Sequence, residues 1–365
     1  MRYKAVLCVA APLLCAAVAS SCADPMARAQ EKLKREEFGS SLKRLKWDER
    51  EQRAIETKES DGRSDSDTVI RVETSLAVFE ILALDRKGRA VSGLSKDDFI
   101  VVEDGVPQEV ATLSPADGSA VPRSIVLIID YSGSLQPFIE SSVAAAKTIV
   151  DRLKPNDRMA VVTDDVALLV DFTRDKGRLK KGLDSLRKRA NSGRPGRSDQ
   201  YSALLATLKE LIVGVERPII IFQTDGDELG RLRSAGGAPS VPAAQFKEYS
   251  LEDIYAAAEK TRATIYSVIP GVRFAGVPPE EHVERARALF GKLFQARQEW
   301  GGWRRPLDSP FEGYLRSRAQ MSLRQQLALA GIADLTGGWA EYLEAPEQAA
   351  EIYDRIFAGI ERRYI

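Results

Sequence analysis

Two apolar runs, each followed by an aspartate, constrain the fold of this chain more than any other feature. Residues 125–129 read Ile-Val-Leu-Ile-Ile and lead directly into Asp130. Residues 218–223 read Pro-Ile-Ile-Ile-Phe-Gln and come just before Asp225. Short apolar runs without alternation are typical of strands that are buried on both faces of a parallel sheet. Because such a sheet needs helices on both sides, the chain is predicted to be an α/β protein.

The segments around these runs alternate between strand and helix patterns. Further strands are predicted at residues 159–163, 167–172, 263–269 and 338–342, and helices at residues 142–153, 202–213, 255–261, 323–335 and 346–361. This alternation predicts a doubly wound, mostly parallel sheet that is flanked by helices. We expect one domain of this kind over residues 119–365, with an insertion at about residues 271–320.

The insertion combines an amphipathic helix pattern with a glycine-rich loop that carries Trp300 and Trp303. Two interpretations stay open. It is either an additional helix that packs on the domain, anchored by the tryptophans, or a flap that contacts a partner. The apolar stripe of the helix consists of Val283, Ala286, Phe290, Leu293 and Phe294.

The N-terminus has the features of a secretory signal peptide over residues 1–23. Arg2 and Lys4 precede an apolar run from Ala5 to Ala19, and small residues follow it. This run is shorter than the ~20 residues that a membrane-spanning helix needs. The mature protein is therefore expected in the periplasm, in the medium or lipid-anchored at the cell envelope. All three cysteines of the chain lie in this leader, so no disulfide is expected.

Cys22 ends the stretch Ala-Ser-Ser-Cys, which faintly resembles the lipobox at which bacterial lipoproteins are lipidated. Ala19 stands where leucine is usual in that motif. Lipidation of Cys22 and simple cleavage near Ala19 or Ala23 are both open. A single lipid would tether the protein to a membrane surface without a spanning helix.

Two segments precede the large domain. Residues 24–67 are crowded with charges of both signs and contain few apolar residues, which predicts a stalk or linker, partly helical and then disordered. Residues 68–118 are predicted to form a small β-rich unit with a capped helical turn at residues 95–99 and a hairpin turn at residues 103–105. Because so small a unit buries little apolar surface alone, it is expected to pack on the domain that follows.

The overall composition argues against several classes of function. Basic and acidic residues both total 53, so nucleic acid is not expected as the main partner. The single histidine, His282, lies in the insertion, and no glycine-rich phosphate loop is present in the sequence. Histidine-based catalytic triads and histidine-ligated zinc are therefore disfavoured. The chain is predicted to be a binding protein and not an enzyme.

Oxygen-bearing side chains follow both buried strands, at the sheet edge where doubly wound proteins bind ligands. Asp130, Ser132 and Ser134 alternate on one loop. Gly133 allows this loop to bend tightly, so that the hydroxyls and the carboxylate can converge on one point. If the two strands are neighbours, Asp225 faces Asp130 across this edge. Oxygen ligands alone suit a hard cation, Mg²⁺ first and then Mn²⁺ or Ca²⁺.

These residues resemble the metal-ion-dependent adhesion site of von Willebrand factor type A (vWA) domains. The pattern Asp130-x-Ser132-x-Ser134 is followed by Thr-Asp-Gly around Asp225, after an apolar strand, as in that family. Over residues 69–365 the sequence is most similar to a bacterial family of exported proteins known as VWFA-related. The resemblance implies that one divalent ion is held at this edge of the sheet.

The resemblance also suggests a fifth ligand. In the family a threonine supplies it from the loop before a helix, and Ser198 occupies the matching position. Asp199 could replace or supplement Ser198, and either residue could instead cap the helix that follows. Asp227 is a secondary candidate, interpreted as an outer-sphere or solvated charge in preference to a direct ligand.

A bound cation with an open coordination position implies metal-dependent binding of an acidic group on a protein or peptide partner. The alternative is a structural or scaffold module in which the metal site is vestigial or only stabilises the fold. A magnesium-dependent enzyme is the least favoured class. Membrane contact is expected only through a lipid anchor at Cys22.

Overall fold

The computed structural model of this chain describes residues 25–48, 53–56, 81–83, 85, 91–114, 122–215, 217–232, 249–299 and 311–364. The predicted signal peptide with Cys22, and Trp300 and Trp303 of the insertion, lie outside these described residues. Within the described segments, no helix combines the length and the apolar character that crossing a membrane requires.

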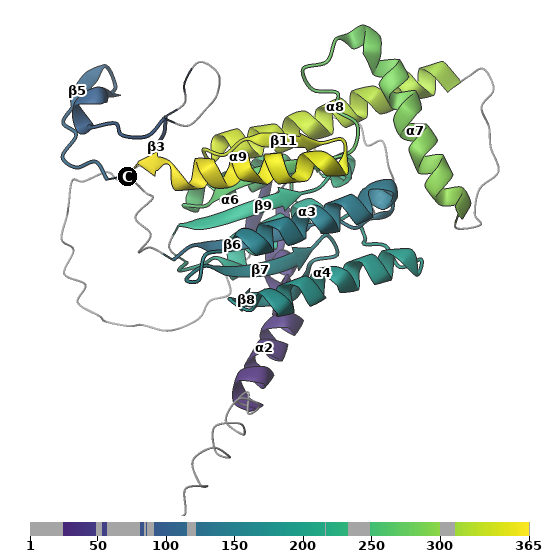
Figure 1. Ribbon diagram of the computed structural model, residues 1–365, viewed down its shortest axis with the longest axis horizontal. Coiled ribbons are helices and arrows are strands. Elements are labelled where there is room, and N and C mark those ends of the chain that lie inside the picture. The colour runs from purple at the N-terminus through teal and green to yellow at the C-terminus, as the bar shows by residue number, and fades with distance from the viewer. Residues whose placement is uncertain are drawn as a thin grey trace, which may run out of the picture.

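A six-stranded sheet forms the centre of the large domain, in the order β11-β10-β9-β6-β7-β8 (Figure 1). Every neighbouring pair is parallel except β7 and β8, which are antiparallel. The mostly parallel sheet predicted from the sequence is therefore confirmed. The strands are β6 (Ser124–Ile129), β7 (Arg158–Thr163), β8 (Ala167–Thr173), β9 (Pro218–Gln223), β10 (Thr264–Pro270) and β11 (Ala340–Leu343).

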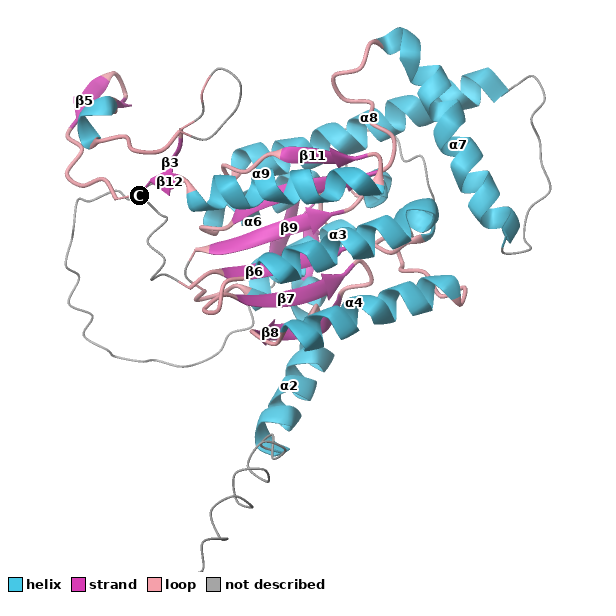
Figure 2. Ribbon diagram, in the orientation of Figure 1, coloured by secondary structure: helices cyan, strands magenta, loops and turns pink. Residues whose placement is uncertain are grey.

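Helices cover both faces of this sheet (Figure 2). Every residue of β6 and β9 is buried, as the unbroken apolar runs predict. In β6, Leu127 packs into the core on one face and Ile128 into the core on the other, because successive side chains of a strand alternate. One layer contains α3 (Ile139–Arg152), α4 (Lys176–Asn191) and α9 (Ala349–Glu361), and the other contains α5 (Gln200–Ala206), α6 (Leu251–Lys260) and α8 (Phe311–Leu335).

Two helices differ from the predictions made from the sequence. The helix α4 was not predicted, although its buried residues Leu179, Leu183, Leu186 and Ala190 recur at helical spacing. The helix α8 begins at Phe311 instead of residue 323, so its first half belongs to the predicted insertion.

The insertion adds a second helix, α7 (His282–Glu299), which packs against the first half of α8. The two helices share a small apolar cluster around Phe274, Ala286 and Leu315, and Phe290 packs against it. In Figure 1 they stand beyond the end of the sheet to which the parallel strands point. The insertion therefore lies at the sheet edge where the predicted site is located.

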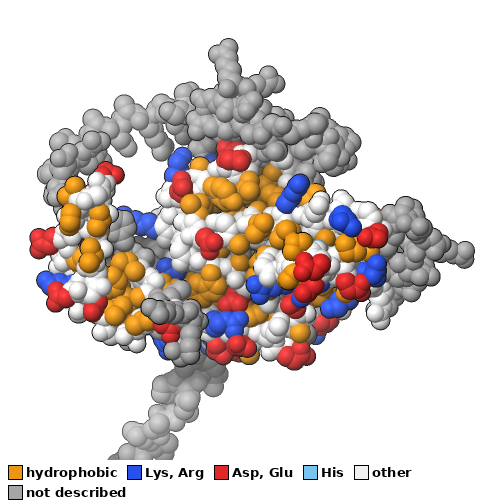
Figure 3. Space-filling view, turned by 90° about the horizontal axis from the view of Figure 1, so that it is seen from above, with side chains coloured by type: hydrophobic (Ala, Val, Ile, Leu, Met, Phe, Trp, Pro, Cys, Tyr) orange, Lys and Arg blue, Asp and Glu red, His pale blue; other side chains and the backbone are white. Residues whose placement is uncertain are grey.

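The small β-rich unit contacts the C-terminal end of the chain. The hydroxyl of Tyr364 accepts a hydrogen bond from the Leu94 N–H (3.0 Å), and its ring lies edge-on to Phe99 at 5.7 Å. In Figure 3 hydrophobic side chains gather over this unit at the left, where Val102 and Val106 are more than half exposed. Its elements are β3 (Ile81–Leu82), η2 (Lys96–Asp98), β4 (Val101–Glu103) and β5 (Val106–Gln108), and β3 pairs with β12 (Arg363–Tyr364).

The segment predicted as a stalk begins with a helix, α2 (Pro25–Glu37), that lies at the β8 edge of the sheet. Lys34 of this helix forms an ion pair of 3.0 Å with Asp171 of β8. The turn after the helix is held by main-chain N–H groups that donate to the carboxylate of Glu210. The elements that follow are η1 (Ser40–Arg44), β1 (Leu45–Asp48) and β2 (Arg53–Glu56).

Candidate metal centre

The candidate site lies where the order of the strands reverses. After β6 the chain continues to β7 on one side, and β9 later pairs with β6 on the other side. Asp130 and Asp225 thus follow two neighbouring strands at the same edge of the sheet, as the sequence predicted. The Asp130 N–H donates to the Gln223 carbonyl oxygen (3.0 Å), which fixes where the first loop leaves the sheet. Ligands of doubly wound proteins bind at such a reversal point.

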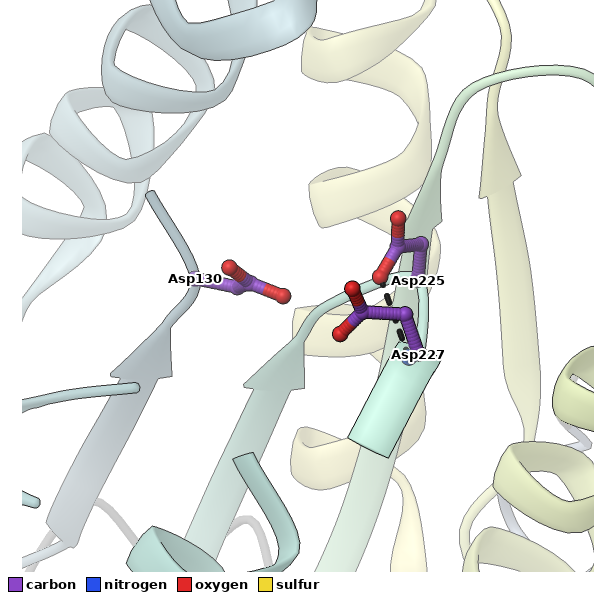
Figure 4. Close-up of side chains that lie close together, drawn as sticks. All are labelled: Asp130, Asp225 and Asp227. Carbon is purple, nitrogen blue, oxygen red and sulfur yellow. Dashed lines mark hydrogen bonds between the residues drawn. The ribbon is translucent and has the colours of Figure 1, made fainter. Parts of the chain in front are cut away.

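Three carboxylates meet at this point. One oxygen of each of Asp130, Asp225 and Asp227 lies within 4.8 Å of the others. Figure 4 shows Asp225 and Asp227 directed toward Asp130. Asp130 is only 1% exposed, and the other two are half-buried. The structure therefore brings Asp227, the secondary candidate, into one cluster with Asp130 and Asp225.

The two predicted serines lie on the loop of residues 130–134, here called the β6 loop. Their hydroxyl oxygens, Ser132 Oγ and Ser134 Oγ, are 3.0 Å apart. The Ser132 N–H donates to Asp130 Oδ1 (2.8 Å), which closes the turn of this loop. Ser134 lines the same cleft as Asp225 and Asp227. The β6 loop thus directs its hydroxyls to the same place as the aspartates.

Gln200 links two of the carboxylates, and it had no role in the prediction from the sequence. Its Nε2 donates to Asp130 Oδ2 (2.7 Å) and to Asp227 Oδ1 (2.6 Å). Its Oε1 accepts from the Glu228 N–H (3.2 Å), which sets the orientation of the amide. Thr224 adds a second donor to Asp130 Oδ2, at 2.7 Å. No simple motif identifies Gln200, because the first residue of a helix carries many residue types.

Ser198 and Asp199 lie on the loop of residues 196–199, here called the α5 loop. The Ser198 N–H donates to Asp164 Oδ2 (2.8 Å), and the residue has a φ of +59°. A non-glycine residue in this left-handed region is strained, and such strain concentrates at functional sites. Asp199 is the N-cap residue of α5, as the capping interpretation predicted, but its side chain makes no capping hydrogen bond.

Asp164 connects the α5 loop to the β6 loop and was also missed. Besides Ser198, it accepts a hydrogen bond from the Tyr131 N–H (3.2 Å). Gly196 passes so close that a Cβ atom there would lie 2.1 Å from both carboxylate oxygens of Asp164. The sequence held a signal for this residue, since Asp164 directly follows the buried strand β7, as Asp130 follows β6.

Burial and mutual repulsion make these carboxylates weaker acids than usual. Burial, and then the charge of Asp227, raises the pKa of Asp130 to about 6. Burial also raises the pKa of Asp225 well above its usual range, with added contributions from the two neighbouring aspartates. Burial raises the pKa of Asp164 to about 9, and the charge of Asp130 adds to this effect. The cluster thus packs together acidic groups whose ionisation is suppressed, and a bound cation would favour their charged forms.

Glu228 is buried next to the cluster but is occupied by other contacts. Its carboxylate accepts from the Tyr201 N–H (2.5 Å) and from the Ser202 N–H and hydroxyl at the start of α5. The hydroxyl of Tyr249 also donates to it, at 3.2 Å. Glu228 therefore positions α5 against the loop of residues 224–228, here called the β9 loop.

The chemistry of the cluster fits a hard divalent cation. All of its side-chain ligands are oxygen atoms, from three carboxylates and two hydroxyls, which Mg²⁺, Mn²⁺ and Ca²⁺ prefer. No Lys or Arg of the described segments forms an ion pair with Asp130, Asp225 or Asp227. Closely packed buried carboxylates repel each other, and a bound cation relieves that repulsion.

Comparison with known proteins supports the same fold. Residues 125–228 match the family model of the von Willebrand factor type A domain. The matched range includes Asp130, Ser132, Ser134, Ser198 and Asp225. A search of curated proteins by sequence gives no match.

Several solved structures are similar at low sequence identity. BatB from Bacteroides thetaiotaomicron is 16% identical, with a TM-score of 0.39, and the match covers 65% of this chain and 98% of that one. The vWF domain of the pilus tip protein Mfa5 from Porphyromonas gingivalis is 13% identical, with a TM-score of 0.36 and coverages of 65% and 94%. The minor pilin PilB from Streptococcus sanguinis is 12% identical, with a TM-score of 0.37 and coverages of 66% and 61%.

Proposed function

Residues 125–228 match the von Willebrand factor type A domain, and the large domain of the chain has this fold. From this premise we propose that the chain is an exported binding protein that uses one divalent cation to bind an acidic group on a protein or peptide partner. The observation that carries this proposal is the meeting of Asp130, Asp225 and Asp227 within 4.8 Å at the strand-order reversal. The paired hydroxyls of Ser132 and Ser134 lie beside them. We expect Mg²⁺ first, and then Mn²⁺ or Ca²⁺.

In this proposal Asp130, Ser132, Ser134 and Asp225 hold the ion. Ser198 supplies a further hydroxyl from the α5 loop, where the main-chain bond to Asp164 keeps it in a left-handed conformation. Asp199 and Asp227 are the secondary ligands. When bound, the cation supplies a Lewis-acidic position that an anionic oxygen of a partner can occupy.

Export is supported by the leader-like sequence of residues 1–23, which lies outside the described residues. The proposed location is the periplasm, the medium or the outer face of a membrane. Lipidation at Cys22 would add a tether there, and cleavage without lipidation would release the protein.

The main alternative is a structural module whose ion only stabilises the fold. Bead-bound peptides distinguish the two functions: Ac-Gly-Asp-Ala-Asn-Gly and its control Ac-Gly-Asn-Ala-Asn-Gly, each presented with MgCl₂ or with EDTA. If the protein binds through its cation, the aspartate peptide should retain it in MgCl₂ but not in EDTA, and the asparagine peptide should retain it in neither buffer. A cooperative melting transition in both buffers shows that the protein stays folded. Equal retention on both peptides, together with a large melting shift on adding MgCl₂, would instead establish the structural role.

A further inference from the structure

Helix α8 presents a polar stripe beside the carboxylate cluster. Leu329 of this helix packs on Gly226 of the β9 loop, where a Cβ atom would lie 3.1 Å from Leu329 Cδ1. This contact fixes the helix against the loop that carries Asp225 and Asp227. Gln325, Ser322 and Arg318 lie one, two and three turns earlier on α8 and therefore share its face with Leu329. We call these three residues the α8 stripe.

The α8 stripe and the metal centre line one cleft. Its lining includes Arg318, Ser322 and Gln325 from the α8 stripe, and Ser134, Asp225 and Asp227 from the metal centre. The cavity has a volume of about 40 Å³. Because one water needs roughly 10–15 Å³ measured in this way, the cleft has room for about three waters or for a small anionic group. A ligand that reaches the cation through this cleft therefore contacts the α8 stripe.

Gln325 has unused hydrogen-bonding capacity in this cleft. The residue is 8% exposed, and its side-chain amide makes no hydrogen bond within the part of the chain that the structure describes, although its polar atoms stay accessible from the cleft. The neighbouring Gln326 contrasts with it: its Oε1 accepts from the Phe274 and Ala275 N–H groups, and its Nε2 donates to the Val272 carbonyl oxygen. Buried polar groups are normally paired. An amide that offers both a donor and an acceptor matches a peptide group.

Arg318 supplies a positive charge to the lining of the same cleft. Among the described residues it has no ion-pair partner, whereas Arg316 on the same helix pairs with Glu312 at 3.1 Å. A guanidinium binds a carboxylate through two parallel hydrogen bonds when the geometry allows. The lining of the cleft thus extends from the acidic cluster to the guanidinium of Arg318, which is available to bind a carboxylate.

We propose that the α8 stripe determines specificity, and that the partner is an acidic peptide segment with two carboxylates. One carboxylate reaches the cation, the peptide group that follows pairs with Gln325, and a second carboxylate binds Arg318. The distance along α8 from Gln325 to Arg318 is about 10 Å, at ~1.5 Å per residue. An extended peptide covers that distance in about three residues, so the two acidic residues lie about three positions apart. This inference rests on the proposed function.

The test compares the peptide Ac-Gly-Asp-Ala-Ala-Asp-Gly-NH₂ with Ac-Gly-Asp-Ala-Ala-Asn-Gly-NH₂ by calorimetry in MgCl₂. The wild type is expected to bind the two-acid peptide about tenfold more tightly, which is the usual effect of one charge-assisted hydrogen-bonded pair. Arg318→Gln is expected to remove this preference and to leave the affinity for the one-acid peptide unchanged. Arg324→Gln is the matched control, because Arg324 is an exposed arginine of the same helix that does not line the cleft.

Gln325→Leu gives an independent measurement. It is expected to weaken the binding of both peptides about fivefold or more. The melting temperature should stay equal or rise, because the Gln325 amide makes no hydrogen bond to the described residues that its loss would break. If the wild type binds the one-acid peptide in MgCl₂ but prefers neither peptide, this inference is overturned and the proposed function stands. If the wild type binds neither peptide, both are overturned. An equal loss of preference in Arg324→Gln would also refute the role of Arg318.

Discussion

Replacing Gln200 with leucine tests whether this amide holds the acidic cluster together. Leucine has a similar size but cannot donate to Asp130 and Asp227, which lie 2.7 and 2.6 Å from Gln200 Nε2. A hydrogen bond to a charged group contributes about 1.5–3 kcal/mol. The substitution also leaves the Glu228 N–H without its acceptor. Since the added apolar group recovers part of the loss, we expect a net destabilisation of about 3 kcal/mol at pH 7.5 in EDTA.

The measurement is urea-induced unfolding at pH 7.5 and at pH 5. The loss should shrink at pH 5, because burial raises the pKa of Asp130 to about 6 and the protonated acid is a weaker acceptor. Gln136→Leu is the control: Gln136 lies in η3 (Gly133–Phe138), and its buried Oε1 has no partner among the described residues, so its loss should be under about 1 kcal/mol. Equal stability of Gln200→Leu and wild type at pH 7.5, or the same loss at both pH values, would refute this reasoning.

Three further predictions concern the loops, the core and the charge of the site. Gly196→Ala should destabilise the fold by about 1–3 kcal/mol and weaken Mg²⁺ binding, because the added Cβ would lie 2.1 Å from both Asp164 oxygens. Gly193→Ala is the control for replacing a glycine without a clash, because nothing lies within 4 Å of a Cβ there. Its φ of +75° adds backbone strain, so the loss from Gly196→Ala has to exceed the loss from Gly193→Ala. Phe222→Ala should lower the free energy of unfolding in denaturant by about 3–5 kcal/mol, since the ring is fully buried and lies edge-on to Tyr201 at 5.9 Å. A decrease of less than about 1 kcal/mol would contradict the packing described. In EDTA the wild type should gain about 2.4 kcal/mol relative to Asp130→Asn as the pH falls from 7.5 to 4. The folded pKa of Asp130, about 6, exceeds the ordinary 3.8, so this contribution is fully present below pH 3.8 and is lost as the pH rises through 6. A stability difference that does not change with pH would exclude it.

The strands that are buried on both faces were predictable, because burial alone determines which residues they contain. The runs that became β6 and β9 contain apolar residues on both faces, and a strand that is covered on both sides accommodates that pattern. The helix α4 was missed because its mean character is strongly polar, and only its four buried residues carry the helical spacing. The start of α8 was missed because its first half packs on α7 and its second half packs on the sheet. The apolar residues of the two halves therefore do not form one continuous stripe.

The sequence predicted the site residues that follow the two buried strands, but not the hydrogen bonds that connect separate loops of the site. Asp130, Ser132, Ser134 and Asp225 come together because two neighbouring strands end at one edge, which the order of elements implies. Gln200 and Asp164 depend on how separate loops pack, and no local spacing encodes that packing. The position of Asp227 depends on Gly226, whose φ of +73° turns the β9 loop back toward Asp130.

The decisive measurement is a calorimetric titration of MgCl₂ into the full chain after treatment with chelator. We expect the wild type to bind one Mg²⁺ per chain. Asp130→Ala should bind at least about tenfold more weakly while its circular dichroism remains that of a folded protein, because it loses a carboxylate at the centre of the cluster. Asp354→Ala, which removes an acid of α9 outside the cluster, should match the wild type. Identical titrations for the wild type and Asp130→Ala, or no binding by the wild type to Mg²⁺, Mn²⁺ or Ca²⁺, would contradict the assignment of this cluster as a metal centre.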